Sequence, residues 1–185
     1  NYGDQFRGEI VVDDNGDVLF ASSTQSLDLN IVNGFDNTIG GTQDGLAVKM
    51  SADLTNLIWS TYVGGSQDDA SYAVQRSSTG DVYITGGTAS NNFPISGGQT
   101  NSYAGGLSDG YILRLDGADG SNLGGTFVGT PAYDQSYFIQ LDQSDEVYVF
   151  GQSNGNMPIS SGVYNNPNSG QFIQKFSTDL SSRLW

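Results

Sequence analysis

The chain consists of three similar segments that follow one another at a spacing of 61 to 65 residues. A turn followed by a strand reads Gly-Asp-Val-Leu-Phe at residues 16–20, Gly-Asp-Val-Tyr-Ile at residues 80–84 and Asp-Glu-Val-Tyr-Val at residues 145–149. A fixed period of this length predicts a repeat architecture, in which each unit buries apolar side chains against its neighbours rather than in a core of its own. This feature constrains the fold more strongly than it constrains the function.

Other segments keep the same register. Asn-Phe-Pro-Ile-Ser at residues 92–96 matches Asn-Met-Pro-Ile-Ser at residues 156–160. A strand that ends in a basic residue occurs three times, at residues 44–49, 109–114 and 170–175. The two tryptophans, Trp59 and Trp185, stand 126 residues apart, or two periods, and by this register Ser-Thr-Tyr-Val-Gly-Gly is expected to follow Trp185 as it follows Trp59.

Short segments rich in β-branched and aromatic residues alternate with Gly, Asn, Asp and Ser in every period, which is the pattern of strands and turns. Segments such as residues 82–84 and 147–150 are apolar at every position, which is typical of sheets covered on both faces. The expected strands are residues 45–50, 58–63, 71–76 and 81–85 in one period, residues 110–115, 125–128, 137–141 and 146–150 in the next, and a strand near residues 8–13 at the start.

These features predict an all-β fold, and four antiparallel strands per period with a long connection between periods predict a β-propeller. The expected division is a half blade plus linker over residues 1–43, a blade over 44–88, a linker over 89–108, a blade over 109–153, a linker over 154–169 and a half blade over 170–185. This amounts to about three four-stranded blades, whereas closed propellers typically have about four or more. We therefore expect part of a larger propeller, with the remaining blades of the same parent protein as its partners.

The composition excludes several classes of function. The chain has 20 Asp and Glu against 6 Lys and Arg, and a net charge of −14 disfavours nucleic acid and anionic lipid as partners. Without cysteine or histidine there can be no disulfide, no thiolate or imidazole metal ligand, and no Ser-His or Cys-His catalytic pair. No apolar stretch approaches the roughly 20 residues that cross a bilayer, so membrane insertion is not expected, and any export signal is expected outside this segment.

The middle period shows an ordered series of motifs. It reads Tyr-Val-Gly-Gly-Ser-Gln-Asp-Asp at residues 62–69, Ser-Thr-Gly-Asp-Val-Tyr-Ile-Thr-Gly at 78–86, Phe-Pro at 93–94 and Asp-Gly-Tyr-Ile-Leu-Arg-Leu at 109–115. This series resembles the SBBP repeat of bacterial β-propellers. The other periods depart from it in turns and at strand ends, with Asn30 in place of Pro94, Gly170 in place of Asp109 and Thr130 in place of Gly65.

The resemblance implies a propeller module of an exported or surface-displayed protein. Proteins similar to it occur in gliding or polysaccharide-degrading Bacteroidota and commonly carry a signal for type IX secretion. The resemblance implies no particular reaction, because propellers include enzymes, lectins and scaffolds.

One turn has the beginning of a calcium-binding pattern. Asp13, Asn15 and Asp17 stand at alternate positions, as in the first part of a calcium loop. Calcium takes about six to eight oxygen ligands, and the later ligands, including a Glu at the twelfth position, are missing. A hairpin turn, in which Asn and Gly adopt positive φ and Asp bonds to the backbone, accounts for all three copies of the segment. No other cofactor is indicated.

Further acidic residues recur once in each period. Asp4, Asp68 or Asp69, and Asp134 precede a strand, where they can either gather ligands on one face or accept hydrogen bonds from loop amides. Asp44 and Asp109 open strands that have Lys49 and Arg114 five residues later. Residues five apart in a strand point to opposite faces, so contacts between blades are expected for them rather than a direct ion pair, with ligand contact as the alternative.

Three tyrosines lie in loops rich in Asn and Gly, where an aromatic ring can stack on a sugar. They are Tyr103, Tyr133 and Tyr164, for which packing inside the protein is the alternative role. A glycosidase needs two carboxylates about 5 to 9.5 Å apart, and no such pair is distinguished by the sequence.

The sequence thus favours a non-enzymatic propeller module of a secreted or cell-surface bacterial protein that acts in adhesion, docking or as a scaffold. Other proteins or surface glycans are its expected partners. The alternatives are a carbohydrate-binding or polysaccharide-degrading propeller, and a component or cargo of the type IX secretion and gliding machinery.

Overall fold

The computed structural model describes residues 8–166 and 169–185, and in these residues it contains three antiparallel β-sheets and no helix. The all-β prediction is confirmed. The first sheet comprises β1 (Glu9–Val12), β2 (Val18–Thr24), β3 (Asp44–Met50) and β4 (Leu57–Val63). The second comprises β5 (Asp69–Arg76), β6 (Val82–Thr88), β7 (Asp109–Leu115) and β8 (Asn122–Val128), and the third comprises β9 (Asp134–Leu141), β10 (Val147–Ser153) and β11 (Gln171–Phe176).

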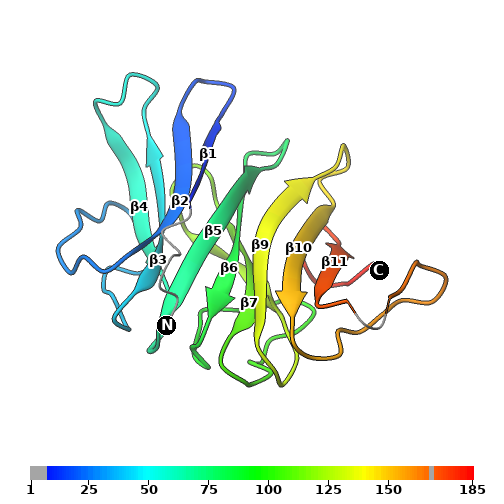
Figure 1. Ribbon diagram of the computed structural model, residues 1–185. Coiled ribbons are helices and arrows are strands. Elements are labelled where there is room, and N and C mark those ends of the chain that lie inside the picture. The colour runs from blue at the N-terminus through cyan, green and yellow to red at the C-terminus, as the bar shows by residue number, and fades with distance from the viewer. Residues whose placement is uncertain (1–7, 167–168) are drawn as a thin grey trace.

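Within each sheet, every strand pairs with the strand that follows it in the chain, so every sheet is a simple meander. The three sheets stand side by side in chain order (Figure 1). β2 packs against β5, and β6 packs against β9, so the second strand of each of the first two sheets contacts the first strand of the next sheet. The described residues include no helix that could span a membrane.

The sheet boundaries differ from the predicted unit boundaries. Residues 44–88 were expected to form one blade, but β3 and β4 belong to the first sheet whereas β5 and β6 belong to the second. Residues 109–153 are divided in the same way between the second and third sheets. A repeat period predicts the spacing of equivalent strands, but it does not say between which two strands one sheet ends and the next begins.

The long segments that were expected to link blades connect two neighbouring strands of the same sheet. Residues 89–108 run from β6 to β7, and residues 154–170 run from β10 to β11. The segment of residues 25–43, between β2 and β3, and the segment of residues 89–108 each fold back along the edge strand of their sheet. Ser60 N–H donates to Val32 O at 2.8 Å, and Gly125 N–H donates to Ser96 O at 2.9 Å. These bonds cover backbone groups that would otherwise be unpaired at the edges of β4 and β8.

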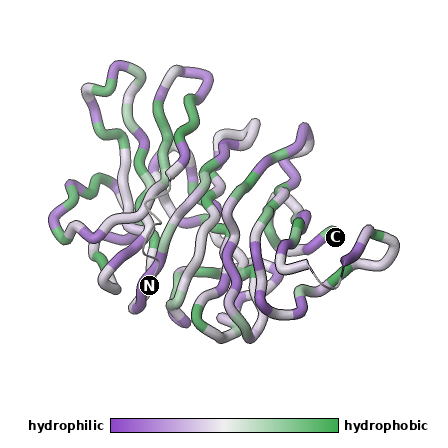
Figure 2. Tube along the Cα trace, viewed as in Figure 1, coloured by the Kyte–Doolittle hydropathy of each residue, from purple (hydrophilic) through white to green (hydrophobic). Residues whose placement is uncertain are grey.

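Two apolar cores lie between adjacent sheets. Val82 and Ile84 of β6 belong to the core shared with the first sheet, and Tyr83 between them belongs to the core shared with the third. This alternation follows from strand geometry, in which successive side chains point to opposite faces. Every residue of β6 is buried, as expected for a strand covered on both faces, and Figure 2 shows apolar residues along the central strands.

The outer faces of the first and third sheets expose apolar side chains. Ile10 and Val12 of β1 are 65% and 61% exposed, and Phe138 of β9 and Ile173 of β11 are 57% and 58% exposed. Ile112, which matches Ile173 in the middle sheet, is fully buried. The exposed outer residues therefore occupy positions that face another sheet in the middle of the stack.

Candidate functional site

The recurring aspartates at strand starts hold loops. Asp44 accepts a hydrogen bond from Gly40 N–H at 2.9 Å, and Asp109 accepts one from Ala104 N–H at 2.5 Å. Burial raises the pKa of Asp44 to about 6 and that of Asp109 to about 7. Asp44 opens β3 and Asp109 opens β7, so the two carboxyls lie at equivalent positions in two sheets. Each accepts a hydrogen bond from the end of the long segment that precedes its strand.

A second set of aspartates holds the connections that pass from one sheet to the next. Asp69 accepts from Gly65 N–H at 2.6 Å and Asp134 accepts from Thr130 N–H at 2.6 Å. Burial raises the pKa of Asp69 to about 6. The alternative residue, Asp68, is partly buried and accepts from Thr42 N–H at 2.9 Å, and the first member of the predicted set, Asp4, lies outside the described residues.

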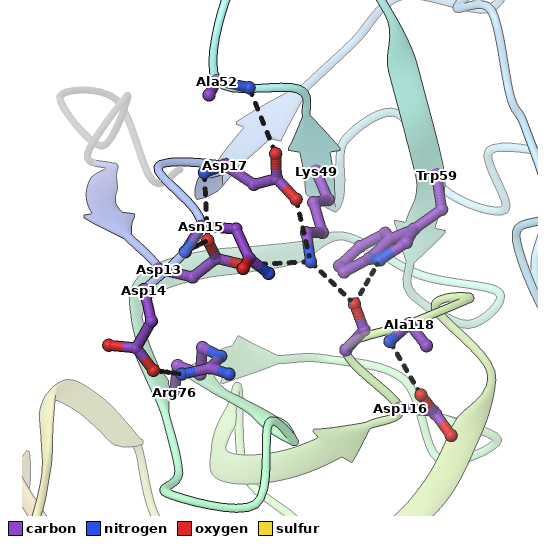
Figure 3. Close-up of polar contacts among 11 residues, drawn as sticks. Asp13, Asp14, Asn15, Asp17, Lys49, Ala52, Trp59, Arg76, Asp116 and Ala118 are labelled. Atoms are coloured by element: carbon purple, nitrogen blue, oxygen red, sulfur yellow. Dashed lines mark hydrogen bonds and ion pairs between the residues drawn. The ribbon is translucent and has the colours of Figure 1, made fainter.

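The turn with the calcium-like pattern is closed by its own backbone and by a lysine. Asp13 Oδ1 accepts hydrogen bonds from the amides of Asn15 at 2.9 Å and Asp17 at 3.0 Å. Lys49 Nζ lies 3.1 Å from Asp13 Oδ2 and 3.5 Å from Asp17 Oδ2 (Figure 3). The ammonium group thus lies against both carboxylates, where a cation would have to bind, and no cluster of three or more acidic side chains suited to a metal occurs in the described part of the chain.

The same ion pair recurs in all three sheets. Arg114 Nε bonds to Asp81 Oδ2 at 2.8 Å, and Lys175 pairs with Asp142 at 3.0 Å and with Glu146. The sequence shows both the acidic turn and the basic strand residue in every period, but it did not indicate that they meet. Lys49 therefore pairs with Asp13 and Asp17, in the turn between β1 and β2, rather than with Asp44 of its own strand.

The three candidate tyrosines have different surroundings. The Tyr103 ring packs edge-on against Phe127 at 6.1 Å, and its hydroxyl donates to Gly106 O at 3.2 Å. Tyr133 is partly buried, which raises its pKa to about 12. Tyr164 is 92% exposed and lines a groove beside the third sheet, so of these three rings it is the one open to a ligand.

That groove has a volume of about 640 Å³. One wall is β11, including Phe172 and Ile173, and the other is the segment of residues 155–166. Trp185 closes one end. Apolar groups on both walls are open to solvent, since Ile159 is 54% exposed and Ile173 is 58% exposed.

The groove was not predicted from the sequence, because the pattern of residues 154–169 is that of a linker between blades. A signal was nevertheless present: Ile159 repeats Ile31 and Ile95 at the same spacing. Ile95 packs against the core between the first two sheets, whereas Ile159 has no such cover.

Comparison with known proteins places no further constraint on the site: no family model matches the chain, and no curated protein matches it significantly.

Proposed function

We propose that this chain is a non-enzymatic docking module, built on the plan of a β-propeller, of a secreted or cell-surface bacterial protein. Support for the propeller plan comes from the 64-residue repeat, the meander in every sheet and the two cores between adjacent sheets. The exposed Ile10 and Phe138 on the two outer faces are placed for contact with further sheets of the same kind. Propellers are sheets arranged around a centre in this way.

The observation on which the docking function depends is the apolar groove at β11. An open groove of about 640 Å³ with apolar walls is a site where a partner can bury surface. The acidic groups, by contrast, repeat the same loop and ion-pair contacts from sheet to sheet, which is the distribution expected of structural residues rather than of a single catalytic centre.

An exported location is supported by composition. The chain lacks cysteine and carries 14 more acidic than basic residues, and its 26 glycines and many Ser, Thr and Asn residues suit a surface protein that folds without disulfides.

Peptide selection on the folded protein tests the docking function. A random displayed-peptide library is panned on the immobilised protein, and each enriched peptide is re-measured against Ile173→Glu and Ile10→Glu. Both side chains are largely exposed on outer faces, so both variants should fold, but only Ile173 lines the groove. We expect enriched peptides that bind the wild type and Ile10→Glu and lose binding to Ile173→Glu.

Enrichment that never depends on Ile173 would contradict the docking function. A glycan-array signal abolished by Tyr164→Ala would instead assign the groove to carbohydrate, and hydrolysis of a polysaccharide by the purified protein would contradict the non-enzymatic proposal.

A further inference from the structure

Asparagine is followed by glycine at three places in the chain, at Asn15, Asn33 and Asn154. In this pair the backbone nitrogen of the second residue can attack the side-chain amide of the first, because glycine has no side chain to hinder the approach. All three asparagines are exposed, and the glycines that follow them are all partly buried. Exposure therefore does not distinguish the three sites.

The hydrogen bonds of the glycine amides do distinguish the sites. Gly16 N–H donates to Asp13 O at 2.9 Å, and Gly155 N–H donates to Ser153 Oγ at 2.9 Å. Gly34 N–H has no hydrogen-bond partner within the described part of the chain. The nitrogen must turn towards the side chain and lose its proton as it attacks, so an amide that is already bonded has to break that bond first.

The turn at Asn33 favours this pair of residues. Asn33 has a φ of +54°, in the left-handed region that glycine and asparagine adopt more readily than most residues. A Cβ at Gly34 would lie 2.3 Å from Ser60 O, which is a backbone atom of β4. Gly34 therefore cannot be exchanged for one of the larger residues that would hinder the attack.

The second sheet builds the same turn without an amide side chain. Gly97 and Gly98 stand 64 residues after Asn33 and Gly34. Gly97 has a φ of +72°, and a Cβ at Gly98 would lie 2.0 Å from Gly125 O. Glycine at position 33 is therefore compatible with the fold, and the second sheet is an internal reference that cannot undergo the reaction.

The reactive pair lies in a short strap, residues 32–36, that covers the outer edge of β4. Before the pair, Val32 O accepts from Ser60 N–H at 2.8 Å. After it, Asp36 O accepts from Tyr62 N–H at 3.1 Å. Only three residues separate these two anchoring carbonyls, so the strap has little room for a longer backbone.

We propose that Asn33 is a site of spontaneous deamidation, and that the isoaspartate formed there releases the strap from β4. Gly34 N bonds to Asn33 Cγ as the Cγ–Nδ2 bond breaks. Ammonia leaves with the proton of Gly34 N, and a five-membered imide remains. Asn33 Nδ2 makes a long hydrogen bond, 3.4 Å to Ile58 O, so little is lost when this nitrogen departs.

Water then opens the imide at one of its two carbonyl groups. Opening at the former side-chain carbonyl gives aspartate with a normal backbone. Opening at the former backbone carbonyl gives isoaspartate, in which the main chain runs through the side chain and is one methylene longer. A longer chain between the anchors at Val32 and Asp36 breaks their pairing with β4, and the strand edge is then left with unpaired N–H groups.

Ageing of the purified protein at mildly alkaline pH tests the proposal. Peptide mass spectrometry, with fragmentation that distinguishes isoaspartate from aspartate, follows each of the three asparagines with time. We expect Asn33 to react about 2- to 10-fold faster than Asn15 and Asn154, which is the factor expected from one hydrogen bond. In urea, where none of these bonds persists, the three sites should react at similar rates.

Hydrogen exchange of the aged protein tests the release of the strap. We expect the Ser60 and Tyr62 amides to lose protection in molecules that carry isoaspartate, while the matching amides of β8, Gly125 and Phe127, keep theirs. Asn33→Gly reproduces the residue of the second sheet, so its Ser60 and Tyr62 amides should stay protected through the same ageing. Freshly prepared Asn33→Asp adds the charge without the longer backbone and should also keep this protection.

Two results would overturn the proposal. One is a rate at Asn33 in the folded protein that is equal to or lower than the rate at Asn15 or Asn154. The other is isoaspartate at position 33 in molecules whose Ser60 and Tyr62 amides are as protected as in fresh protein, since the strap would then have stayed in place.

Discussion

At the scale of single residues, the carboxyls that recur in each period act as loop anchors, and their burial makes them sensitive to pH. Asp109 illustrates this best, because burial, with a smaller contribution from Asp134, raises its pKa from 3.8 to about 7, against a lowering by the Ala104 amide. The folded state holds this proton more tightly than the unfolded state. Its contribution to stability is therefore complete below about pH 4 and is lost as pH rises towards 7.

We predict that Asp109→Asn reduces the fall in melting temperature between pH 5 and pH 8. The amide oxygen can still accept from Ala104 N–H, but no buried charge forms as pH rises. Melting temperatures across this range, measured by differential scanning calorimetry, check the prediction. Asp53→Asn, in an exposed turn, is the control and should leave the slope unchanged, because the pKa of Asp53 is about 2 and it stays ionised over this range. An Asp109→Asn curve of melting temperature against pH that runs parallel to the wild-type curve would contradict the prediction.

Lys49 allows a second residue-scale prediction. It pairs with the buried Asp13 and donates to Gly117 O at 3.3 Å, so Lys49→Met should lower the free energy of unfolding by about 1 to 3 kcal/mol. Adding Asp13→Asn should recover part of this loss, since no buried carboxylate is then left unpaired. Urea unfolding of the two variants measures both effects, and an equal or larger loss in the double variant would show that the pair is not the cause.

The same turn predicts no response to calcium. With the Lys49 ammonium against Asp13 and Asp17, we expect equal melting temperatures in calcium and in a chelator. A rise in melting temperature that grows with calcium concentration would establish a cation site that the ion pair does not prevent.

At the scale of strands and sheets, the sequence predicted most of the strands but not how they are grouped. Continuous runs of β-branched, aromatic and aliphatic residues located β6 and β7 well, because both strands are buried on two faces and bounded by Gly and Asp turns. The sheet boundary after β4 could not be predicted. The turn of residues 64–68 that crosses between sheets is shorter than the segment of residues 89–108 that stays within one, and length alone pointed the other way.

The candidate site was less predictable than the strands. Local sequence indicated turn residues such as Asp13, which bond within a few positions of themselves. Local sequence did not indicate the groove, because the two walls of the groove come from separate segments, residues 155–166 and β11. Whether the groove is open to solvent also depends on which strand lies beside β11. Ile159 repeats Ile95 in the sequence, but this indicates an apolar wall at Ile159 only once Ile95 is known to pack against the core.

Contact between sheets predicts the effect of one glycine. A Cβ at Gly110 of β7 would lie 2.3 Å from Ser136 Oγ and 2.8 Å from Val128 O, so Gly110→Ala should cost about 1 to 3 kcal/mol of unfolding free energy. Gln171 occupies the same repeat position in β11, where it is exposed and no further described sheet approaches it. Gln171→Ala should therefore be nearly neutral. Equal effects of the two variants in chemical unfolding would refute the close approach of the second and third sheets.

At the scale of the whole molecule, a net charge of −14 opposes association of the two apolar outer faces. Salt screens this repulsion over about 10 Å at 0.1 M ionic strength while leaving apolar attraction in place. We predict that the protein is monomeric at low salt and associates as sodium chloride is raised, as measured by sedimentation velocity. Ile10→Lys and Phe138→Lys, one on each outer face, should each reduce association at high salt despite making the net charge less negative. Leu54→Lys changes the charge equally at an exposed turn and should not reduce it, so association that follows net charge alone would show that the outer faces are not the contact surfaces.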